Sequence, residues 1–205
     1  MRPVPVCAAI VLAGGRGRRM GDSDKPVLPV GGRQMLLRVL DALADTAPRV
    51  VVGPPRQVPA GVLVTREEPP GGGPVAAVAA GFDLLDDAPF VAIVAADQPF
   101  LTAAAVTALR RTAATAPADC DGAVFVDGDR RQLLCGVWRS TVVRHRLATL
   151  GDPTGVAVRA LLGGLRAEPV RPSGRQPPPW YDCDTADDVA RAERWLAEGV
   201  APGDR

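Results

Sequence analysis

The sequence "VCAAIVLAGGRGRRMGDSDK" spans residues 6–25 and joins a short apolar run to a glycine-rich loop that ends in a lysine. The run is continuously apolar, which is typical of a strand covered on both faces of a parallel sheet. Ligands collect where the strands of such sheets end. Gly14 and Gly15 let the backbone approach an anion closely, and Arg19 and Lys25 add positive charge. The stretch therefore predicts a polyphosphate cradle after the first strand.

Lys25 is the only lysine among the 24 basic residues, and the chain contains no asparagine. These two facts indicate a compositional drift that would replace lysine by arginine wherever charge alone matters. An ammonium is a compact point charge, whereas a guanidinium is a planar fork. We therefore infer that Lys25 is kept for its compact ammonium, with chance placement as the alternative.

Length, charge and cysteine content narrow the class of protein. The chain of 205 residues fits one domain, which we expect over residues 1–198 with a flexible tail over 199–205. The 24 basic and 23 acidic residues nearly cancel, so we expect neither a nucleic-acid nor a membrane partner. No run approaches the about 18 apolar residues of a membrane span. The four cysteines lie too far apart for a zinc cluster, and a reducing cytoplasm is the simplest location.

Apolar runs bounded by glycine or proline alternate with stretches of helical spacing. Strands are predicted at 6–13, 49–53, 61–65 and 90–96, and helices at 33–45, from Pro74, at 102–115 and at 186–197. A hairpin around Gly128 and Asp129 is predicted from strands at 121–127 and 131–138, followed by a strand at 166–170. This alternation predicts an α/β fold with a mainly parallel sheet and a small antiparallel hairpin region.

Acidic residues at two places suggest a metal site. Asp97 follows a buried apolar run directly, where a carboxylate is costly unless it is paired. Mg²⁺ is a suitable partner because it binds one or two carboxylates together with substrate phosphates. The alternatives for Asp97 are capping of the helix that begins near Thr102 and an Asx-turn before Pro99. Asp182 and Asp184, in the sequence "DCDT", either complete the Mg²⁺ site or, for Asp184 or Thr185, cap the last helix.

Two familiar phosphate loops do not fit the glycine-rich stretch. A Walker loop requires Gly-Lys-Ser/Thr, but here Asp24 precedes Lys25 and Pro26 follows it. The dinucleotide fingerprint fails because Met20 stands at its last glycine position. The stretch instead matches the nucleotidyltransferase signature L-A-G-G-x-x-x-R-M-G-x-x-D-K without a gap. The matching residues are Leu12, Ala13, Gly14, Gly15, Arg19, Met20, Gly21, Asp24 and Lys25.

On these residues the chain resembles the molybdenum cofactor guanylyltransferases of the MobA-like NTP-transferase group. The resemblance continues in "GGGPVAAVAAGFD", "VAADQPFL" and "WYDCDTADDVARAERW", and covers roughly residues 6–196. It implies a Rossmann-like, three-layer nucleotidyltransferase fold. It also implies transfer of GMP from GTP to molybdopterin with release of pyrophosphate. GTP, a molybdopterin-type phosphate acceptor and other cofactor-biosynthesis proteins are the implied partners, and Mg²⁺ is the implied cofactor.

The resemblance also implies roles for individual residues. Catalytic roles fall on Lys25, Arg19 and Asp97, and metal ligation on Asp97 and Asp184. Of the adjacent Glu67 and Glu68, where the family places an acidic group near the guanine base, we predict Glu68. The alternatives are Glu67 and a solvated pair of charges that contacts no base. The predicted nucleotide-binding residues are Leu12, Ala13, Gly14, Gly15, Lys25, Gly53, Glu68 and Asp97.

The chain departs from the family pattern at "DCDT", where relatives often carry Asn-x-Asn-Thr. "DQP" and "DCDT" have features of cytidylyltransferases, whereas "LAGG" favours the guanylyl branch. A transferase that uses CTP on molybdopterin, or one that acts on a sugar phosphate or phospholactate, therefore remains an alternative. A nucleotide-binding protein that delivers the cofactor without catalysis is the alternative from another class.

Overall fold

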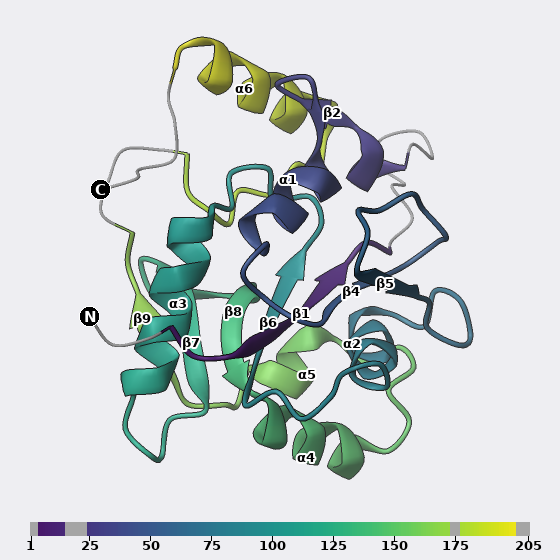
Figure 1. Ribbon diagram of the computed structural model, residues 1–205, viewed down its shortest axis with the longest axis vertical. Helices are drawn as coiled ribbons and strands as arrows, with labels where there is room; N and C mark the ends of the chain where they lie inside the picture. The colour runs from purple at the N-terminus through teal and green to yellow at the C-terminus, as the bar shows by residue number, and fades with distance from the viewer. Residues whose placement is uncertain (1–3, 15–23, 173–176, 200–205) are drawn as a thin grey trace.

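The computed structural model describes residues 4–14, 24–172 and 177–199, and its centre is a seven-stranded sheet (Figure 1). β8 runs antiparallel to β6 and β7, and every other neighbouring pair is parallel. The predicted α/β fold with a mainly parallel sheet is therefore confirmed. In sheet order, the strands are β5 (Val62–Thr65), β4 (Arg49–Val52), β1 (Cys7–Leu12), β6 (Phe90–Ala95), β8 (Arg130–Arg139), β7 (Gly122–Asp127) and β9 (Ala167–Val170).

Helices cover both faces of the sheet and give three layers (Figure 1). One face is covered by α1 (Met35–Ala42) and α3 (Ala103–Thr115), and the other by α2 (Pro74–Phe82), α4 (Ser140–Leu150) and α5 (Val158–Leu162). Along β1, Ala9 and Val11 pack toward α1 and α3, while Ala8 and Ile10 pack toward α2. Because both faces of β1 are buried, its sequence is continuously apolar rather than alternating.

A third apolar cluster lies outside the sheet, between α6 (Ala186–Ala197) and the small antiparallel hairpin of β2 (Pro29–Val30) and β3 (Arg33–Gln34) (Figure 1). Phe100, Tyr181 and Trp195 form its aromatic centre, with edge-on ring contacts at 4.9–5.9 Å between centroids. These contacts hold the C-terminal helix against the β2–β3 hairpin.

Several elements differ from the prediction. The helix expected at 33–45 begins only at Met35, because Arg33 and Gln34 pair with the preceding segment as β3. α4 and α5 were not predicted: α4 opens with β-branched residues at Thr141, Val142 and Val143, and α5 has only five residues. The hairpin at Gly128 is confirmed, with that residue at φ 56°.

The structure also bears on the state of the cysteines and on whether any helix could span a membrane. All four cysteines are buried and free. No helix in the described part of the chain is both long and apolar enough to span a membrane. The residues from 200 onward, most of the expected tail, lie outside the described ranges.

Candidate functional site

Three loops leave the carboxyl ends of β1, β4 and β6 side by side. The Ala13 N–H donates to the Val52 carbonyl oxygen at 2.8 Å, which joins the ends of β1 and β4. The Ala96 N–H donates to the Leu12 carbonyl oxygen at 3.0 Å, which joins the ends of β6 and β1. The ladder of backbone hydrogen bonds between the strands thus continues one residue beyond their ends. It fixes the starting points of the glycine loop and of the segment that carries Asp97.

Gly53 brings the backbone after β4 against the glycine loop. A Cβ atom placed on Gly53 would lie 2.7 Å from the Ala13 carbonyl oxygen and 2.9 Å from the Gly14 nitrogen. Real Cβ atoms do not approach backbone that closely, so only glycine fits without moving the loop. The predicted residues Leu12, Ala13, Gly14 and Gly53 therefore lie together. Gly15 and Arg19 lie outside the described residues.

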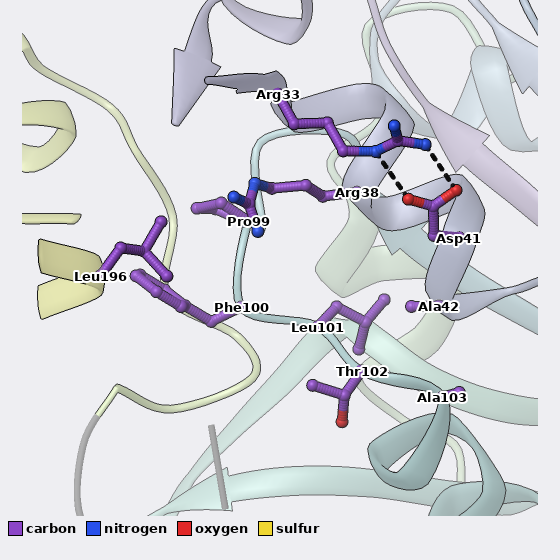
Figure 2. Close-up of a pocket in the computed structure, with 10 residues that line it drawn as sticks. All are labelled: Arg33, Arg38, Asp41, Ala42, Pro99, Phe100, Leu101, Thr102, Ala103 and Leu196. Atoms are coloured by element: carbon purple, nitrogen blue, oxygen red, sulfur yellow. Dashed lines mark hydrogen bonds and ion pairs between the residues drawn. The ribbon is translucent and has the colours of Figure 1, made fainter. Parts of the chain in front are cut away.

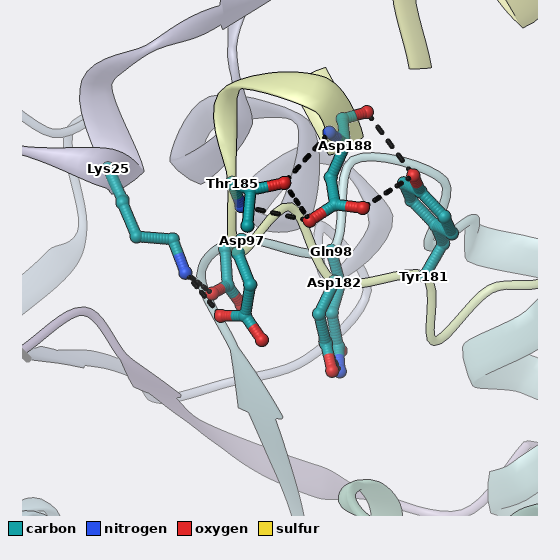
Figure 3. Close-up of polar contacts among 8 residues, drawn as sticks. Lys25, Asp97, Gln98, Tyr181, Asp182, Thr185 and Asp188 are labelled. Carbon is teal, nitrogen blue, oxygen red and sulfur yellow. Dashed lines mark hydrogen bonds and ion pairs between the residues drawn. The ribbon is translucent and has the colours of Figure 1, made fainter. Parts of the chain in front are cut away.

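The Lys25 ammonium lies between two carboxylates from distant parts of the chain (Figure 3). Its Nζ is 2.8 Å from Oδ2 of Asp97 and 2.7 Å from Oδ1 of Asp184. Partial burial disfavours the charge, but the two carboxylates outweigh it and raise the pKa of Lys25 above its ordinary value. Lys25 is therefore a fixed positive charge at neutral pH, held at the carboxyl end of β6.

Neither Asp97 nor Asp184 is a helix cap. Thr102 caps α3 by accepting from the Ala105 N–H at 3.1 Å. Thr185 caps α6 and forms a capping box with Asp188 (Figure 3). The capping alternative for both aspartates is excluded by these contacts. Both carboxylates are thereby left for the charge on Lys25.

Asp182 lies beside this pair but has a different partner. Its Oδ1 accepts a hydrogen bond from Nε2 of the buried Gln98 at 3.1 Å. Desolvation of the carboxyl, together with the nearby charge of Asp97, raises the pKa of Asp182 to about 6. The Cys183 N–H donates to the Asp97 carbonyl oxygen at 3.1 Å, which ties the "DCDT" segment to the end of β6.

The structure brings Glu67, and not the predicted Glu68, to the glycine loop. Glu67 is 6% exposed, and its Oε1 accepts from the Gly71 N–H at 2.9 Å. Its carboxylate oxygens lie 3.8 and 3.9 Å from the point where a Cβ of Gly14 would stand. Glu68 is exposed and lines a hollow beside α2 with Arg66 and Asp83. Adjacent glutamates have the same chemistry, so no signal in the sequence separates them.

Arg56 is a residue of this region that the sequence analysis missed. It lies in the loop after β4, and its side chain is only 5% exposed. Its Nη2 donates to the Ala13 carbonyl oxygen at 2.9 Å and to Oδ1 of Asp24 at 2.6 Å. The surrounding "GPPRQVPA" matches no motif, and an arginine in a proline-rich loop carries no sign of burial.

A separate hollow lies beside the segment that follows Asp97, between α1 and Leu196 of α6 (Figure 2). Its wall includes a two-armed ion pair in which Nε of Arg33 lies 2.7 Å from Oδ2 of Asp41 and Nη2 lies 2.8 Å from Oδ1. Both side chains are about half exposed. None of the predicted site residues that the structure describes lines this hollow, so the pair serves as a reference for an ordinary surface ion pair.

The donor set at Lys25 suits a divalent cation that also binds phosphate. Oxygens of Asp97 and Asp184 already converge on one positive atom, within 2.8 Å. Within the described ranges, no group of three or more His, Cys, Asp or Glu residues could hold a metal ion. The protein therefore offers two carboxylates, which is what Mg²⁺ uses when substrate phosphates and water complete its shell.

The fold and motifs match known proteins along nearly the whole chain. A protein named molybdenum cofactor guanylyltransferase, from Rhodopseudomonas palustris (strain BisB5), is 34% identical over 203 residues, which cover 93% of this chain and 94% of that protein. The solved structure of molybdopterin-guanine dinucleotide biosynthesis protein A from Archaeoglobus fulgidus has a TM-score of 0.72 at 19% identity, with 93% of this chain and 99% of that one covered.

A cytidylyltransferase also shares the fold. The structure of 2-C-methyl-D-erythritol 4-phosphate cytidylyltransferase from Thermus thermophilus has a TM-score of 0.64 at 18% identity, with 92% of this chain and 98% of that one covered. Structural likeness at such low identity shows the fold alone, whichever nucleotide the neighbour uses. The family model described as the MobA-like NTP transferase domain matches residues 9–193. The chain therefore belongs to the MobA-like NTP transferase family.

Proposed function

We propose that the protein transfers GMP from GTP to the terminal phosphate of molybdopterin and releases pyrophosphate. The observation that carries this proposal is the convergence of Lys25 with Asp97 and Asp184 beside the glycine loop after β1. The guanylyltransferase name of the 34%-identical relative supports the choice of reaction. The carboxyl edge of a parallel sheet, where these residues meet, is where such folds bind nucleotides.

The chemistry requires alignment and neutralisation of charge more than a strong base. A phosphate monoester is already anionic and can attack the α-phosphorus of GTP in line. Lys25 would bind the phosphoryl oxygens as charge develops on them, with the amide of Gly14 at the loop. Asp97 and Asp184 would hold Mg²⁺, which when bound supplies positive charge to the triphosphate. Arg19 and the Gly15 amide are proposed to assist at the phosphates.

Glu67 is the residue that we propose as the reader of the base. Its Oε1 is engaged by the Gly71 N–H, and its Oε2 is buried without a partner among the described residues. Guanine presents two adjacent donors, N1–H and the 2-amino group, to a carboxylate, whereas cytosine presents a single amino group on that edge. A buried carboxylate beside Gly14 therefore favours GTP over CTP.

The setting of the reaction is part of the same proposal. A reducing cytoplasm suits four free, buried cysteines and a nucleotide substrate. We propose that the protein acts there and passes its product to other proteins of cofactor biosynthesis.

Pyrophosphate release tests the proposal directly. The protein is incubated with molybdopterin and, in turn, GTP, CTP, ATP and UTP, with and without Mg²⁺. We expect release only with GTP, acceptor and Mg²⁺ together. A thermal-shift titration with the same nucleotides separates binding from turnover, since a ligand of the native state raises its melting temperature. Turnover with CTP instead would make the protein a cytidylyltransferase, and binding of GTP without any release would indicate a delivery protein.

A further inference from the structure

We infer that Arg56 is a positioning residue. It joins the two ends of the glycine loop, residues 14–23, and thereby holds Lys25 in place. The inference rests on the proposed function in that the loop is the one that would bind the triphosphate. No sequence motif points to Arg56; its role follows from its contacts and its burial.

The contacts of Arg56 span the loop. Ala13 comes just before residues 14–23, and Asp24 comes just after them. One nitrogen, Nη2, donates to the Ala13 carbonyl oxygen at 2.9 Å and to the Asp24 carboxylate at 2.6 Å. Arg56 belongs to neither end, since it follows β4. A side chain from a third segment therefore joins the beginning of the loop to its end.

Burial shows that this arrangement differs from an ordinary surface ion pair. The side chain of Arg56 is 5% exposed, and its Nε and Nη1 are buried without a partner in the described part of the chain. Unpaired donors on a buried guanidinium are unfavourable. By contrast, Arg33 and Asp41 pair through two arms in solvent. The burial of Arg56 therefore costs stability. This cost is explained if the site requires Arg56 for positioning Ala13 and Asp24 more than for stabilising the fold.

The link from Asp24 to Lys25 is one peptide bond long. The Asp24 carbonyl oxygen accepts from the Val27 N–H at 3.0 Å and so begins the 3₁₀ turn Lys25–Val27. Fixing the Asp24 side chain therefore fixes the start of the turn from which the lysine extends. A lysine side chain is a flexible four-carbon stem, so the direction of its first bond decides whether Nζ reaches Asp97 and Asp184.

The single lysine makes the test direct. Because Lys25 is the only lysine in the chain, an amine-acylating reagent has one side-chain target, and its rate of modification is followed by peptide mass spectrometry. We expect Arg56→Ala to speed acylation of Lys25 several-fold, since the amine is then less firmly held by its two carboxylates. Asp24→Asn, a change at a half-exposed side chain, is expected to do the same, and the double variant is expected to add nothing further.

A matched control lies at the other end of β1. Arg110 is likewise buried, with 5% of the whole residue exposed, and its Nε and Nη2 donate to the Pro5 carbonyl oxygen at 3.2 and 2.5 Å. Arg110→Ala is expected to lower the melting temperature and to leave Lys25 acylation unchanged. Equal acceleration in both arginine variants would show general loosening and overturn the inference. Unchanged acylation in Arg56→Ala would overturn it too, and if Arg56→Ala does not fold, the acylation rate of Asp24→Asn decides in the same way.

Kinetics provide a second readout. If the loop is misplaced by about an ångström, kcat/KM for GTP should fall by about 100-fold in Arg56→Ala. Arg56→Lys, which keeps the charge but lacks the fork, should recover only part of the loss. The acylation experiment needs no substrate. If wild-type protein releases no pyrophosphate from GTP, the proposed function fails while the acylation rates still decide the role of Arg56.

Discussion

At the amino end of β1, Arg110 donates to the carbonyl oxygen of Pro5, and at the carboxyl end Arg56 donates to the carbonyl oxygen of Ala13. Both side chains are almost fully buried. Arg110 is bound to backbone alone in the described structure, whereas Arg56 also pairs with the carboxylate of Asp24. Within the described residues, a buried arginine therefore hydrogen-bonds only to backbone at the amino edge of the sheet. At the carboxyl edge, a buried arginine also contacts a charged side chain next to Lys25.

The difference extends to the other polar groups at the two edges. Near the amino edge, the hydroxyl of the buried Thr46 donates to the Leu43 carbonyl oxygen three residues away, at 2.7 Å. At the carboxyl edge, Lys25 meets Asp97 and Asp184, which are 72 and 159 residues distant in sequence. The buried hydroxyl near the amino edge thus has a local backbone partner, whereas the charged side chains at the carboxyl edge meet across long separations in sequence.

The largest effect that follows from this contrast is loss of turnover at the carboxyl edge. Lys25→Ala and Asp97→Ala should each lower kcat by about a thousandfold or more, because both remove charge complementarity from the transition state. The measurement is pyrophosphate release at saturating GTP and Mg²⁺, with thermal melting to check the fold. Arg33→Ala, which breaks an exposed pair outside the site, is the control and should keep the wild-type rate. Near-wild-type turnover in either site variant would remove that residue from the mechanism.

A smaller effect should separate the two adjacent glutamates. Glu67→Gln replaces one acceptor of the buried carboxylate and should lower kcat/KM for GTP by about 10- to 100-fold, because hydrogen bonds to a charged group are stronger than neutral ones. The exposed neighbour provides the control, since Glu68→Gln should leave kcat/KM for GTP unchanged. Measuring GTP and CTP in parallel gives the selectivity. If the two variants behave alike, or if Glu68→Gln is the more damaging, Glu67 is not the reader of the base.

Alanine variants of two glycines at the carboxyl edge test how closely the backbone segments must approach each other there. Gly53→Ala should lower the free energy of unfolding by about 1–3 kcal/mol, since its Cβ has no room against Ala13. Gly14→Ala should change it by less than about 0.5 kcal/mol, because its nearest neighbours would be at ordinary contact distance. Both should weaken GTP binding in a thermal-shift titration. A stable Gly53→Ala protein with normal affinity would show that the close approach is not needed.

The sequence predicted those features whose cause is local. Continuous apolar character predicted β1 as a strand buried on both faces, and the last helix was predicted at its observed bounds with Thr185 among its candidate caps. Glu67 was kept only as an alternative to Glu68, because burial of one glutamate and not its neighbour depends on packing against Gly14, which is distant in sequence. Arg56 was missed because its contacts to Ala13 and Asp24 also join segments that are distant in sequence. α4 was missed because its β-branched opening resembles a strand, although it follows β8 directly.

The smallest effect concerns two aspartates four residues apart. Asp188 accepts from Thr185 in the capping box, so Asp188→Asn should lower the free energy of unfolding by about 1 kcal/mol without changing kcat. Asp184 lies outside the box, so Asp184→Asn should leave stability nearly unchanged and raise the Mg²⁺ concentration needed for turnover. Denaturant unfolding and a Mg²⁺ titration of each variant distinguish the two roles.

The pH dependence of the Asp188 contribution follows from its pKa. Burial of the carboxyl opposes ionisation, but hydrogen bonds from Thr185 and Tyr181 outweigh it and hold the pKa of Asp188 below its ordinary value of 3.8. A depressed pKa stabilises the fold above the ordinary value, and this contribution is lost as the pH falls through the folded-state pKa. The stability difference between wild type and Asp188→Asn should therefore be full at about pH 6 and shrink in acid below about pH 4. A difference that persists unchanged in acid would mean that the asparagine variant loses packing and not a charge-assisted cap.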